Sequence, residues 1–268
     1  MLAWAHINLV HLIIMFTSKQ QKQKIKLANV KKILLVASGK GGVGKSTVAA
    51  NLAISLVELG YKVGLLDADI YGPSIPRIFE INHQPQVTEG LLQPHKKFKI
   101  SLMSMGFLVP EGSALIWRGP MLTKAVHQLF KMTAWGDLDY LIVDTPPGTG
   151  DIHLSIAENY VIDGAIVITT PQKLALIDAF KAVDMFFKLK IDIMGVIENM
   201  AYYTNSASGA NEYIFGKNSL PSYCEDKKIK FIEQIPLDQD LSNKTLINLM
   251  DNNNIKAIFE RILNKLIK

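Results

Sequence analysis

Five short, uninterrupted apolar runs alternate along this chain with longer segments of helical periodicity. The apolar runs cover residues 33–37, 63–66, 140–144, 164–169 and 193–197. A strand made only of apolar residues is buried on both faces, as happens in parallel sheets covered by helices. The main helical segments are Lys45–Leu59, Pro120–Met132 and Lys173–Lys188. The alternation therefore predicts an α/β fold, with a doubly wound, mostly parallel sheet and helices on both faces.

Two further stretches differ from this alternation. Residues 85–105 alternate apolar with polar residues and contain turn residues, which favours a hairpin inserted at a sheet edge over another βαβ unit. The segment 254–268 has helical periodicity, and its apolar stripe consists of Ile255, Ile258, Phe259, Ile262, Leu263 and Leu266. Because the chain shows no internal repeat and no long linker, we expect residues 31–268 to form one domain.

Residues 1–30 do not fit this pattern. The first sixteen, MLAWAHINLVHLIIMF, are apolar but include two histidines and an asparagine, and a membrane span needs about 20 residues. The run lacks the preceding positive charge and the following small-residue cleavage site of a signal peptide. We expect residues 1–30 to be a disordered extension or a non-native start, and to be dispensable for the chemistry.

The net charge of +5 is unevenly distributed. Residues 1–57 contain eight lysines and no acidic residue, whereas the remaining 211 residues carry a balance of −3. Much of the excess lies in KQQKQKIKLANVKK, which we interpret as a solvated linker, so no nucleic-acid partner is expected. The single cysteine excludes a disulfide framework and indicates a reducing, cytoplasmic setting.

A glycine-rich stretch, SGKGGVGKST (38–47), joins the first apolar run to the first helical segment. It matches the pattern G-x-x-x-x-G-K-[ST] in the strand–loop–helix context of a phosphate-binding loop. Glycines let the backbone N–H groups point inward around an anion, and the helix start adds its positive dipole end. We expect Lys45 to neutralise nucleotide phosphates and Ser46 to bind Mg²⁺. The predicted nucleotide contacts are Gly39, Lys40, Gly41, Gly42, Val43, Gly44, Lys45, Ser46 and Thr47.

Acidic residues end two of the apolar runs. The run at 63–66 is followed by Asp67 and Asp69, and the run at 140–144 ends at Asp144. Ligands of open α/β sheets gather at the carboxyl ends of the strands, where these residues are expected to lie. Asp144 and Asp67 are predicted magnesium ligands, and either Asp67 or Asp69 could orient the attacking water. Turn and helix-cap residues of the same type are the structural alternative.

The loop contains a second lysine, Lys40, for which the phosphate-binding pattern has no place. Lys45 already serves the site from within, and the surrounding glycines give Lys40 little room to fold back. We interpret Lys40 as a cation that points outward and reaches a nucleotide held by another copy of the chain. A cation supplied in trans in this way can raise phosphoryl transfer by about 10³–10⁵-fold. A solvent-exposed lysine without function is the alternative.

These residues resemble a known family. SGKGGVGKST is similar to the deviant Walker A loop of the ParA/MinD/NifH-type ATPases, in which the extra lysine acts within an ATP-sandwich homodimer. Five more segments, in family order, resemble the Mrp/ApbC-type iron–sulfur cluster carrier ATPases: DADIYGPSIP (67–76), WRGPM (117–121), DYLIVDTPPGTGD (139–151), TTPQ (169–172) and IENM (197–200). The resemblance implies a Mg²⁺-dependent ATPase in which Lys40 acts in trans and Asp69 positions water. It also implies that Asn199, Pro236 and Asp238 line the adenine pocket.

The chain departs from that family where the family binds iron. A C-x-x-C pair normally follows the IENM segment, and matching without gaps places Asn205 and Ser208 at the two cysteine positions. Iron–sulfur clusters are held by thiolates, for which neutral oxygen donors are poor substitutes. Cys224, the only thiol, is interpreted as an unreactive cysteine. The family implies a cluster and apo iron–sulfur client proteins, yet the cluster ligands are missing.

Two other functions remain open at this stage. A cluster-free regulatory ATPase, or a positioning ATPase of the MinD or ParA kind, would keep the nucleotide switch alone. The basic amphipathic segment 254–268 could lie on an anionic membrane, although docking onto the sheet is the commoner fate and a membrane partner is not expected. A small-molecule kinase or ligase is the other possibility, but no acceptor-binding group of residues stands out.

Overall fold

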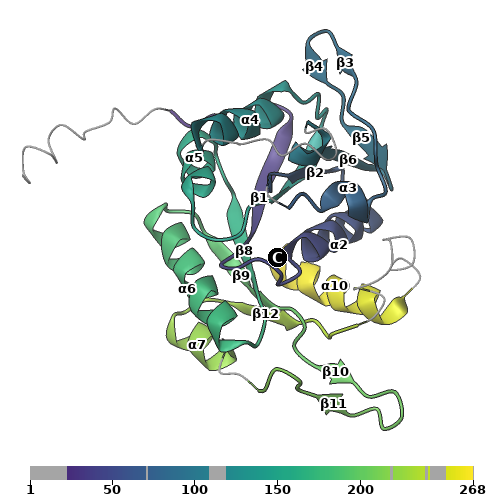
Figure 1. Cartoon of the computed structure of the whole chain (residues 1–268), viewed down its shortest axis with the longest axis vertical. Helices are drawn as coiled ribbons and strands as arrows, with labels where there is room; N and C mark the ends of the chain where they lie inside the picture. The colour runs from purple at the N-terminus through teal and green to yellow at the C-terminus, as the bar shows by residue number, and fades with distance from the viewer. Residues whose placement is uncertain are drawn as a thin grey trace, which may run out of the picture.

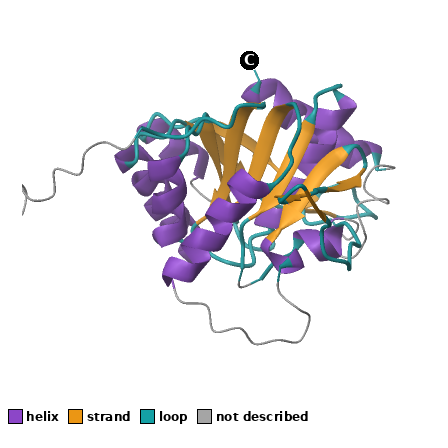
Figure 2. Cartoon of the chain, turned by 90° about the horizontal axis from the view of Figure 1, so that it is seen from above, coloured by secondary structure: helices purple, strands orange, loops and turns teal. Residues whose placement is uncertain are grey.

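The computed structural model describes residues 23–70, 72–108, 119–217, 220–238, 241 and 252–267, and an eight-stranded sheet lies at its centre (Figures 1 and 2). The strand order is β12-β9-β8-β1-β7-β2-β6-β5. Neighbouring strands run parallel except for β5, which pairs antiparallel with β6 at the sheet edge. The strands are β1 (Val30–Ser38), β2 (Val63–Asp67), β5 (His95–Lys97), β6 (Ile100–Ser104), β7 (Leu138–Asp144), β8 (Gly164–Thr169), β9 (Ile193–Glu198) and β12 (Phe231–Gln234).

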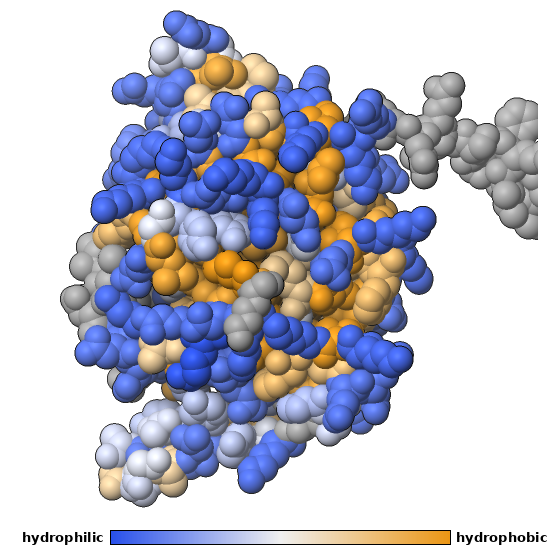
Figure 3. Space-filling model, turned by 180° about the vertical axis from the view of Figure 1, so that it is seen from behind, coloured by the Kyte–Doolittle hydropathy of each residue, from blue (hydrophilic) through white to orange (hydrophobic). Residues whose placement is uncertain are grey.

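Helices cover both faces of this sheet. In Figure 1, α4, α5, α6 and α7 lie on one side of the strands, and α2, α3 and α10 lie on the other. The helices are α2 (Lys45–Glu58), α3 (Ile75–Ile78), α4 (Gly119–Met132), α5 (Asp151–Asn159), α6 (Lys173–Lys188), α7 (Leu220–Asp226) and α10 (Asn253–Leu266). Seen from behind, hydrophilic side chains surround a central band of apolar ones (Figure 3). The predicted doubly wound α/β fold is confirmed.

The elements predicted from periodicity are all present. The five apolar runs form β1, β2, β7, β8 and β9, and α6 spans the predicted residues. The first predicted helix ends one residue early, at Glu58, and Gly60 follows with a left-handed φ of 89°. A residue with a side chain adopts that φ only at a cost, so Gly60 suits the end of this helix.

The region 85–105 contains more than the predicted hairpin. Strands β3 (Val87–Thr88) and β4 (Leu91–Leu92) form one small hairpin, and β5 with β6 forms another at the sheet edge. However, β6 also pairs parallel with β2 over five residues and is entirely buried. It therefore completes a βαβ-type unit, which we did not expect from the sequence. Its serines explain the error. Ser101 and Ser104 interrupt the apolar run, and a buried strand was not expected there.

The terminal helix α10 docks onto the body of the protein. All six residues of its predicted apolar stripe are buried, and the helix packs against α2 and β12. Asn252 caps its start by accepting hydrogen bonds from the amides of Asn254 and Ile255 at 3.1 and 3.2 Å. Docking is therefore confirmed over the membrane-surface alternative for this helix. In the described part of the chain, no helix is both long and apolar enough to cross a membrane.

The segment ahead of β1 also contacts the domain. The amide of Ile25 donates to the carbonyl of Asn159 at 2.7 Å, and the amide of Val161 donates back to Ile25 at 3.0 Å. Ile25 and Leu27 pack against the core. Contacts therefore begin before the predicted boundary at residue 31, whereas residues 1–22 of the predicted extension lie outside the described residues.

Candidate functional site

The glycine-rich loop connects β1 to α2 at the carboxyl edge of the sheet. Gly42 and Gly44 adopt left-handed φ angles of 81° and 80°. A Cβ atom on Gly39 would lie 2.0 Å from the backbone carbon of Asp178 in α6, so only glycine fits there. The start of α2 has neither a side-chain cap nor an acidic residue in its first turn. The positive end of this helix is therefore available to an anion.

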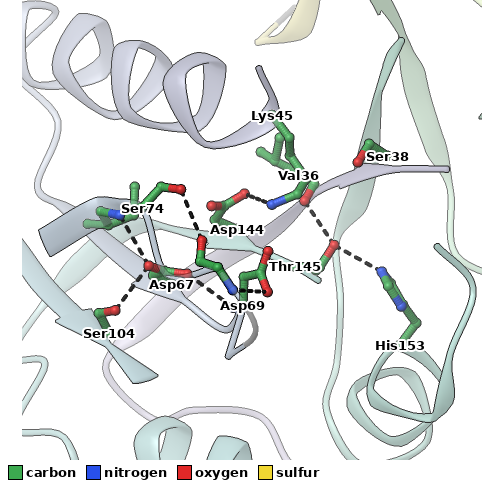
Figure 4. A network of polar contacts seen from close by, with 12 residues as sticks. Val36, Ser38, Lys45, Asp67, Asp69, Ser74, Ser104, Asp144, Thr145 and His153 are labelled. Atoms are coloured by element: carbon green, nitrogen blue, oxygen red, sulfur yellow. Dashed lines mark hydrogen bonds and ion pairs between the residues drawn. The ribbon is translucent and has the colours of Figure 1, made fainter. Parts of the chain in front are cut away.

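A buried ion pair lies directly beneath the loop. The Nζ atom of Lys45 is 2.5 Å from Oδ1 of Asp144, the last residue of β7 (Figure 4). Burial raises the pKa of Asp144, and the ammonium group of Lys45 acts in the opposite direction. The second carboxylate oxygen, Oδ2, is buried and has no hydrogen-bond partner among the described residues. An unsatisfied carboxylate oxygen beside a phosphate-binding loop is a ready ligand for a hard divalent cation.

Asp67 lies next to this pair, since the β2–β7 register places it opposite Asp144. Its oxygens accept hydrogen bonds from Ser104 Oγ at 3.0 Å and from the amides of Ile75 and Asp69 at 3.2 and 3.0 Å. Burial, followed by the charge of Asp144, raises the pKa of Asp67 to about 8. Asp67 therefore anchors the chain between β2 and α3, with no exposed surface of its own.

Asp69 is placed differently from Asp67. It is 8% exposed and lines the open cavity above the loop, whereas Asp67 is 0% exposed and does not line it. Its Oδ1 accepts a hydrogen bond from the amide of Gly72 at 3.3 Å. Of the two carboxylates between which the sequence left the choice open, only Asp69 lines the cavity.

The cavity has a volume of about 1330 Å³ and brings most of the predicted site residues together. The predicted residues that line it are Lys40, Gly41, Gly42, Gly44, Lys45, Ser46, Thr47, Asp69, Asn199, Pro236 and Asp238. Four of the predicted residues do not line the cavity. Gly39 and Val43 belong to the backbone of the loop, and the buried Asp67 and Asp144 lie beneath the loop. Segments far apart in the sequence thus meet around one cavity large enough for a nucleotide.

Asn199 has a contact that the sequence did not predict. Its Nδ2 donates a hydrogen bond to the carbonyl of Val43 in the loop at 2.9 Å. A Cβ atom on Gly44 would lie 2.2 Å from that same nitrogen. The amide of Asn199 therefore supports the loop directly, in addition to lining the cavity where an adenine contact was expected.

Lys40 lies at the mouth of the cavity. Its side chain is exposed, and no ion pair among the described residues involves it. Its carbonyl accepts a hydrogen bond from Ser38 Oγ at 2.9 Å, which fixes the backbone of the loop at this point. The outward role of Lys40 stays a prediction, since exposure and a place beside the cavity are all that these contacts show.

The loop after β7 is held by contacts that sequence reasoning missed. The amide and hydroxyl groups of Thr145 both donate to the carbonyl of Val36 at 3.0 Å, and the amide of Gly148 donates to Ser38 at 2.8 Å. His153 Nε2 lies 3.0 Å from the Thr145 hydroxyl. The sequence could not predict the contact between His153 and Thr145, because a single histidine near the start of a helix belongs to no motif that identifies its partner.

The residues at the family's cysteine positions lie in a separate arm. Strands β10 (Tyr203–Thr204) and β11 (Asn211–Glu212) form a hairpin that projects from the body (Figure 1). Asn205 Oδ1 accepts from the amides of Ala207 and Ser208 at 2.9 and 3.2 Å, and its Nδ2 donates to Glu212 at 2.7 Å. The side chain of Asn205 thus uses both its oxygen and its nitrogen in hydrogen bonds that close the turn.

Cys224 does not compensate for this arrangement. It lies in α7, is 1% exposed, and burial raises its pKa to about 11. Within the described residues, no group of three or more His, Cys, Asp or Glu side chains could hold a metal ion. The donors present do not fit a thiolate-ligated iron–sulfur cluster.

A glycine-rich loop that leads from a central strand into a helix, with a lysine and an aspartate paired below it, is the phosphate site of P-loop nucleoside triphosphatases. The chain is of that class. It belongs to the ParA group, in the family described as the NUBPL iron-transfer P-loop NTPase, whose model matches residues 29–267.

Curated relatives carry the name iron–sulfur cluster carrier protein. The chain is 54% identical to the protein of Rickettsia felis over 219 residues, which cover 82% of this chain and 65% of the relative. It is 44% identical to the Escherichia coli protein over 240 residues, 87% of this chain and 65% of the relative. The chain thus spans less than two thirds of the length of these relatives.

Solved structures show the same fold. A nucleotide-binding protein of Archaeoglobus fulgidus in complex with ADP is 34% identical, with a TM-score of 0.70 over 87% of this chain and 88% of that one. The cell division protein MinD of Aquifex aeolicus has a TM-score of 0.61 over 88% of this chain and 97% of that one. Its sequence identity is 20%, so this likeness concerns the fold alone.

Proposed function

We propose that this protein binds and hydrolyses ATP with the help of Mg²⁺. The observation that carries the proposal is the buried Oδ2 of Asp144, which has no hydrogen-bond partner among the residues that the structure describes and lies next to Lys45, beneath a cavity that fits a nucleotide. Ser46 lines the same cavity, so its hydroxyl and Asp144 are the groups that would hold the metal. Bound there, Mg²⁺ would neutralise charge on the β- and γ-phosphates.

The residues of the chain supply the rest of the mechanism. The loop amides and Lys45 bind the phosphates, while Asn199 and Pro236 line the end of the cavity proposed for the adenine. Asp69 accepts a hydrogen bond from the attacking water and aligns it with the γ-phosphorus. A new P–O bond forms to the water oxygen and the bond to the bridging oxygen breaks. ADP and phosphate leave, and the proton lost by water passes to the phosphate.

A second copy of the chain is the proposed partner for this reaction. Helices α4, α5 and α6 start at the carboxyl edge of the sheet, on the side of the loop, and expose large apolar side chains near their starts. Met121 is 54% exposed, Leu154 39% and Leu174 68%. Apolar side chains around a phosphate site are suited to contact with protein. Lys40, at the cavity mouth, could then reach the phosphates of the facing copy.

We further propose that the ATP cycle serves iron–sulfur cluster transfer, the role that the names of the relatives give them. The cluster is cargo in this role, and apo iron–sulfur proteins are the clients. Because Cys224 is buried and Asn205 is committed to its turn, the thiolates that hold the cargo would come from the client or from another protein. The same observation supports the alternative of a cluster-free regulatory or positioning ATPase, which would not need a client.

Release of free phosphate tests the enzymatic part. Purified protein should release phosphate from ATP with Mg²⁺ present, and chelation with EDTA should abolish the release. Lys45→Ala should abolish binding or turnover, and Lys131→Ala, which changes an exposed lysine on α4, should not. Phosphorylation of a metabolite in place of free phosphate would favour a kinase and contradict the proposal.

A further inference from the structure

His153 is a buried histidine with a defined partner next to the phosphate site. It lies in the first turn of α5 and is 1% exposed. Its Nε2 is 3.0 Å from the hydroxyl of Thr145, the residue that follows Asp144 (Figure 4). The proposed mechanism has no role for His153, so its burial beside the ion pair needs an explanation of its own.

The hydrogen bonds define the state of the imidazole. Thr145 Oγ1 has a single hydrogen and donates it to the carbonyl of Val36 at 3.0 Å, so it accepts from His153. On this geometry we assign the proton to His153 Nε2, which leaves Nδ1 as the acceptor; Nδ1 is buried and has no hydrogen-bond partner in the described part of the chain. Burial, with the nearby charge of Lys45, lowers the pKa of His153 to about 4. The neutral ring is a fixed donor aimed at Thr145.

This hydrogen bond closes the loop that follows the metal-binding carboxylate. Thr145 and His153 stand at the two ends of residues 145–153, and the first end is tied to β1 through Val36. Between them, Gly148 donates its amide to Ser38 at the start of the phosphate-binding loop. The loop is thus held at Thr145, at Gly148 and at His153. Thr145 directly follows Asp144 in the chain, so the orientation of Asp144 depends on how Thr145 is held.

We propose that His153 is a positioning residue for ATP hydrolysis, which holds Thr145, and through it Asp144, in the catalytic orientation. This inference rests on the proposed ATPase function. A misplacement of a catalytic group by about 1 Å costs on the order of 10²-fold in rate, so a lost hydrogen bond at this point should reduce kcat. Because His153 does not line the cavity, the KM for ATP should change little.

Two amide variants test the assigned nitrogen. His153→Gln places an amide donor near the position of Nε2, whereas His153→Asn places it near Nδ1, out of reach of Thr145. We expect His153→Asn to lower kcat about tenfold at nearly constant KM, and His153→Gln to stay within about threefold of wild type. Thr145→Val removes the bond to His153 together with the hydrogen bond from the hydroxyl to Val36, so it should lower kcat at least as much as His153→Asn. Adding His153→Asn to Thr145→Val should lower kcat no further, because the bond between the two side chains is already absent.

A control variant separates positioning from general stability. His127 lies in α4, and its Nε2 is 2.7 Å from the hydroxyl of Ser155 in α5, the helix that also carries His153. His127→Leu should lower the melting temperature and leave kcat of the folded protein unchanged. Equal kcat for the Gln and Asn variants, or loss of activity only in proportion to the unfolded fraction, would overturn the inference. A wild-type protein without ATPase activity would instead overturn the proposed function itself.

Discussion

Lys45 should stabilise the nucleotide-free protein as well as bind phosphate. Its ammonium group pairs with Asp144 at 2.5 Å, and its charge also lowers the pKa of Asp67, while both aspartates are completely buried. Lys45→Met keeps much of the side-chain volume but leaves these carboxyl groups without their cation. Breaking a buried pair in this way costs about 3–5 kcal/mol. For a domain of this size that is roughly 6–20 °C in melting temperature.

The stability lost in Lys45→Met should depend on pH, and the loss should be larger at high pH. Lys45 opposes the effect of burial on Asp144, so its removal should raise the folded-state pKa of Asp144 further above the ordinary value of 3.8. A raised folded-state pKa means that stability is present at low pH and is lost as pH rises through the folded-state value. The difference in melting temperature between Lys45→Met and wild type should therefore be larger at pH 8 than at pH 5.

Thermal denaturation followed by circular dichroism, without nucleotide, measures this effect. The double variant Lys45→Met/Asp144→Asn removes both charges and should recover most of the lost stability, since a neutral replacement for a buried pair is often tolerated. If Lys45→Met melted within about 2 °C of wild type at pH 8, the ion pair would not stabilise the fold and the reasoning would fail.

The remaining predictions concern the dimer and the cluster. Lys40→Ala should bind ATP like wild type but hydrolyse it at least tenfold more slowly. Lys99→Ala, which removes another exposed lysine, should hydrolyse ATP at the wild-type rate. An unchanged rate for Lys40→Ala would contradict the role in trans. Anaerobic reconstitution with iron and sulfide should load wild type with no stoichiometric cluster, because Cys224 is buried with a pKa of about 11. Asn205→Cys/Ser208→Cys should gain iron under the same conditions, and a stoichiometric cluster on wild type would show that other ligands exist.

Much of the fold could be predicted because its signals are local. An apolar run between two helices reads as a buried parallel strand wherever it occurs, as for β1, β7 and β8. A hairpin was predicted in this region, but the burial of β6 and its parallel pairing with β2 were not, because Ser101 and Ser104 are polar. The burial of these serines is explained only by partners on other segments. Ser104 donates to Asp67 in the neighbouring strand, and Ser101 accepts from Lys96. Such partners are distant in sequence or unmarked by any motif.

The site divides in the same way. The phosphate-binding loop was predictable because its residues are consecutive, and the place of Asp144 followed from the rule that parallel strands present their carboxyl ends to ligands. The rule could not choose between Asp67 and Asp69, which differ by two positions. Their contacts in the structure distinguish them, because Asp67 accepts three hydrogen bonds and Asp69 lines the cavity.

By itself, the sequence determined the α/β class, the phosphate-binding loop and the absence of a cysteine pair, because residue type and short spacing suffice for each. Only the tertiary structure decided that Asn199 supports the loop, that His153 holds Thr145, and that Cys224 is buried. These facts depend on strand register and helix packing, which bring together side chains separated by up to 156 positions. Contacts of that kind arise from the folded chain as a whole, so no local pattern records them.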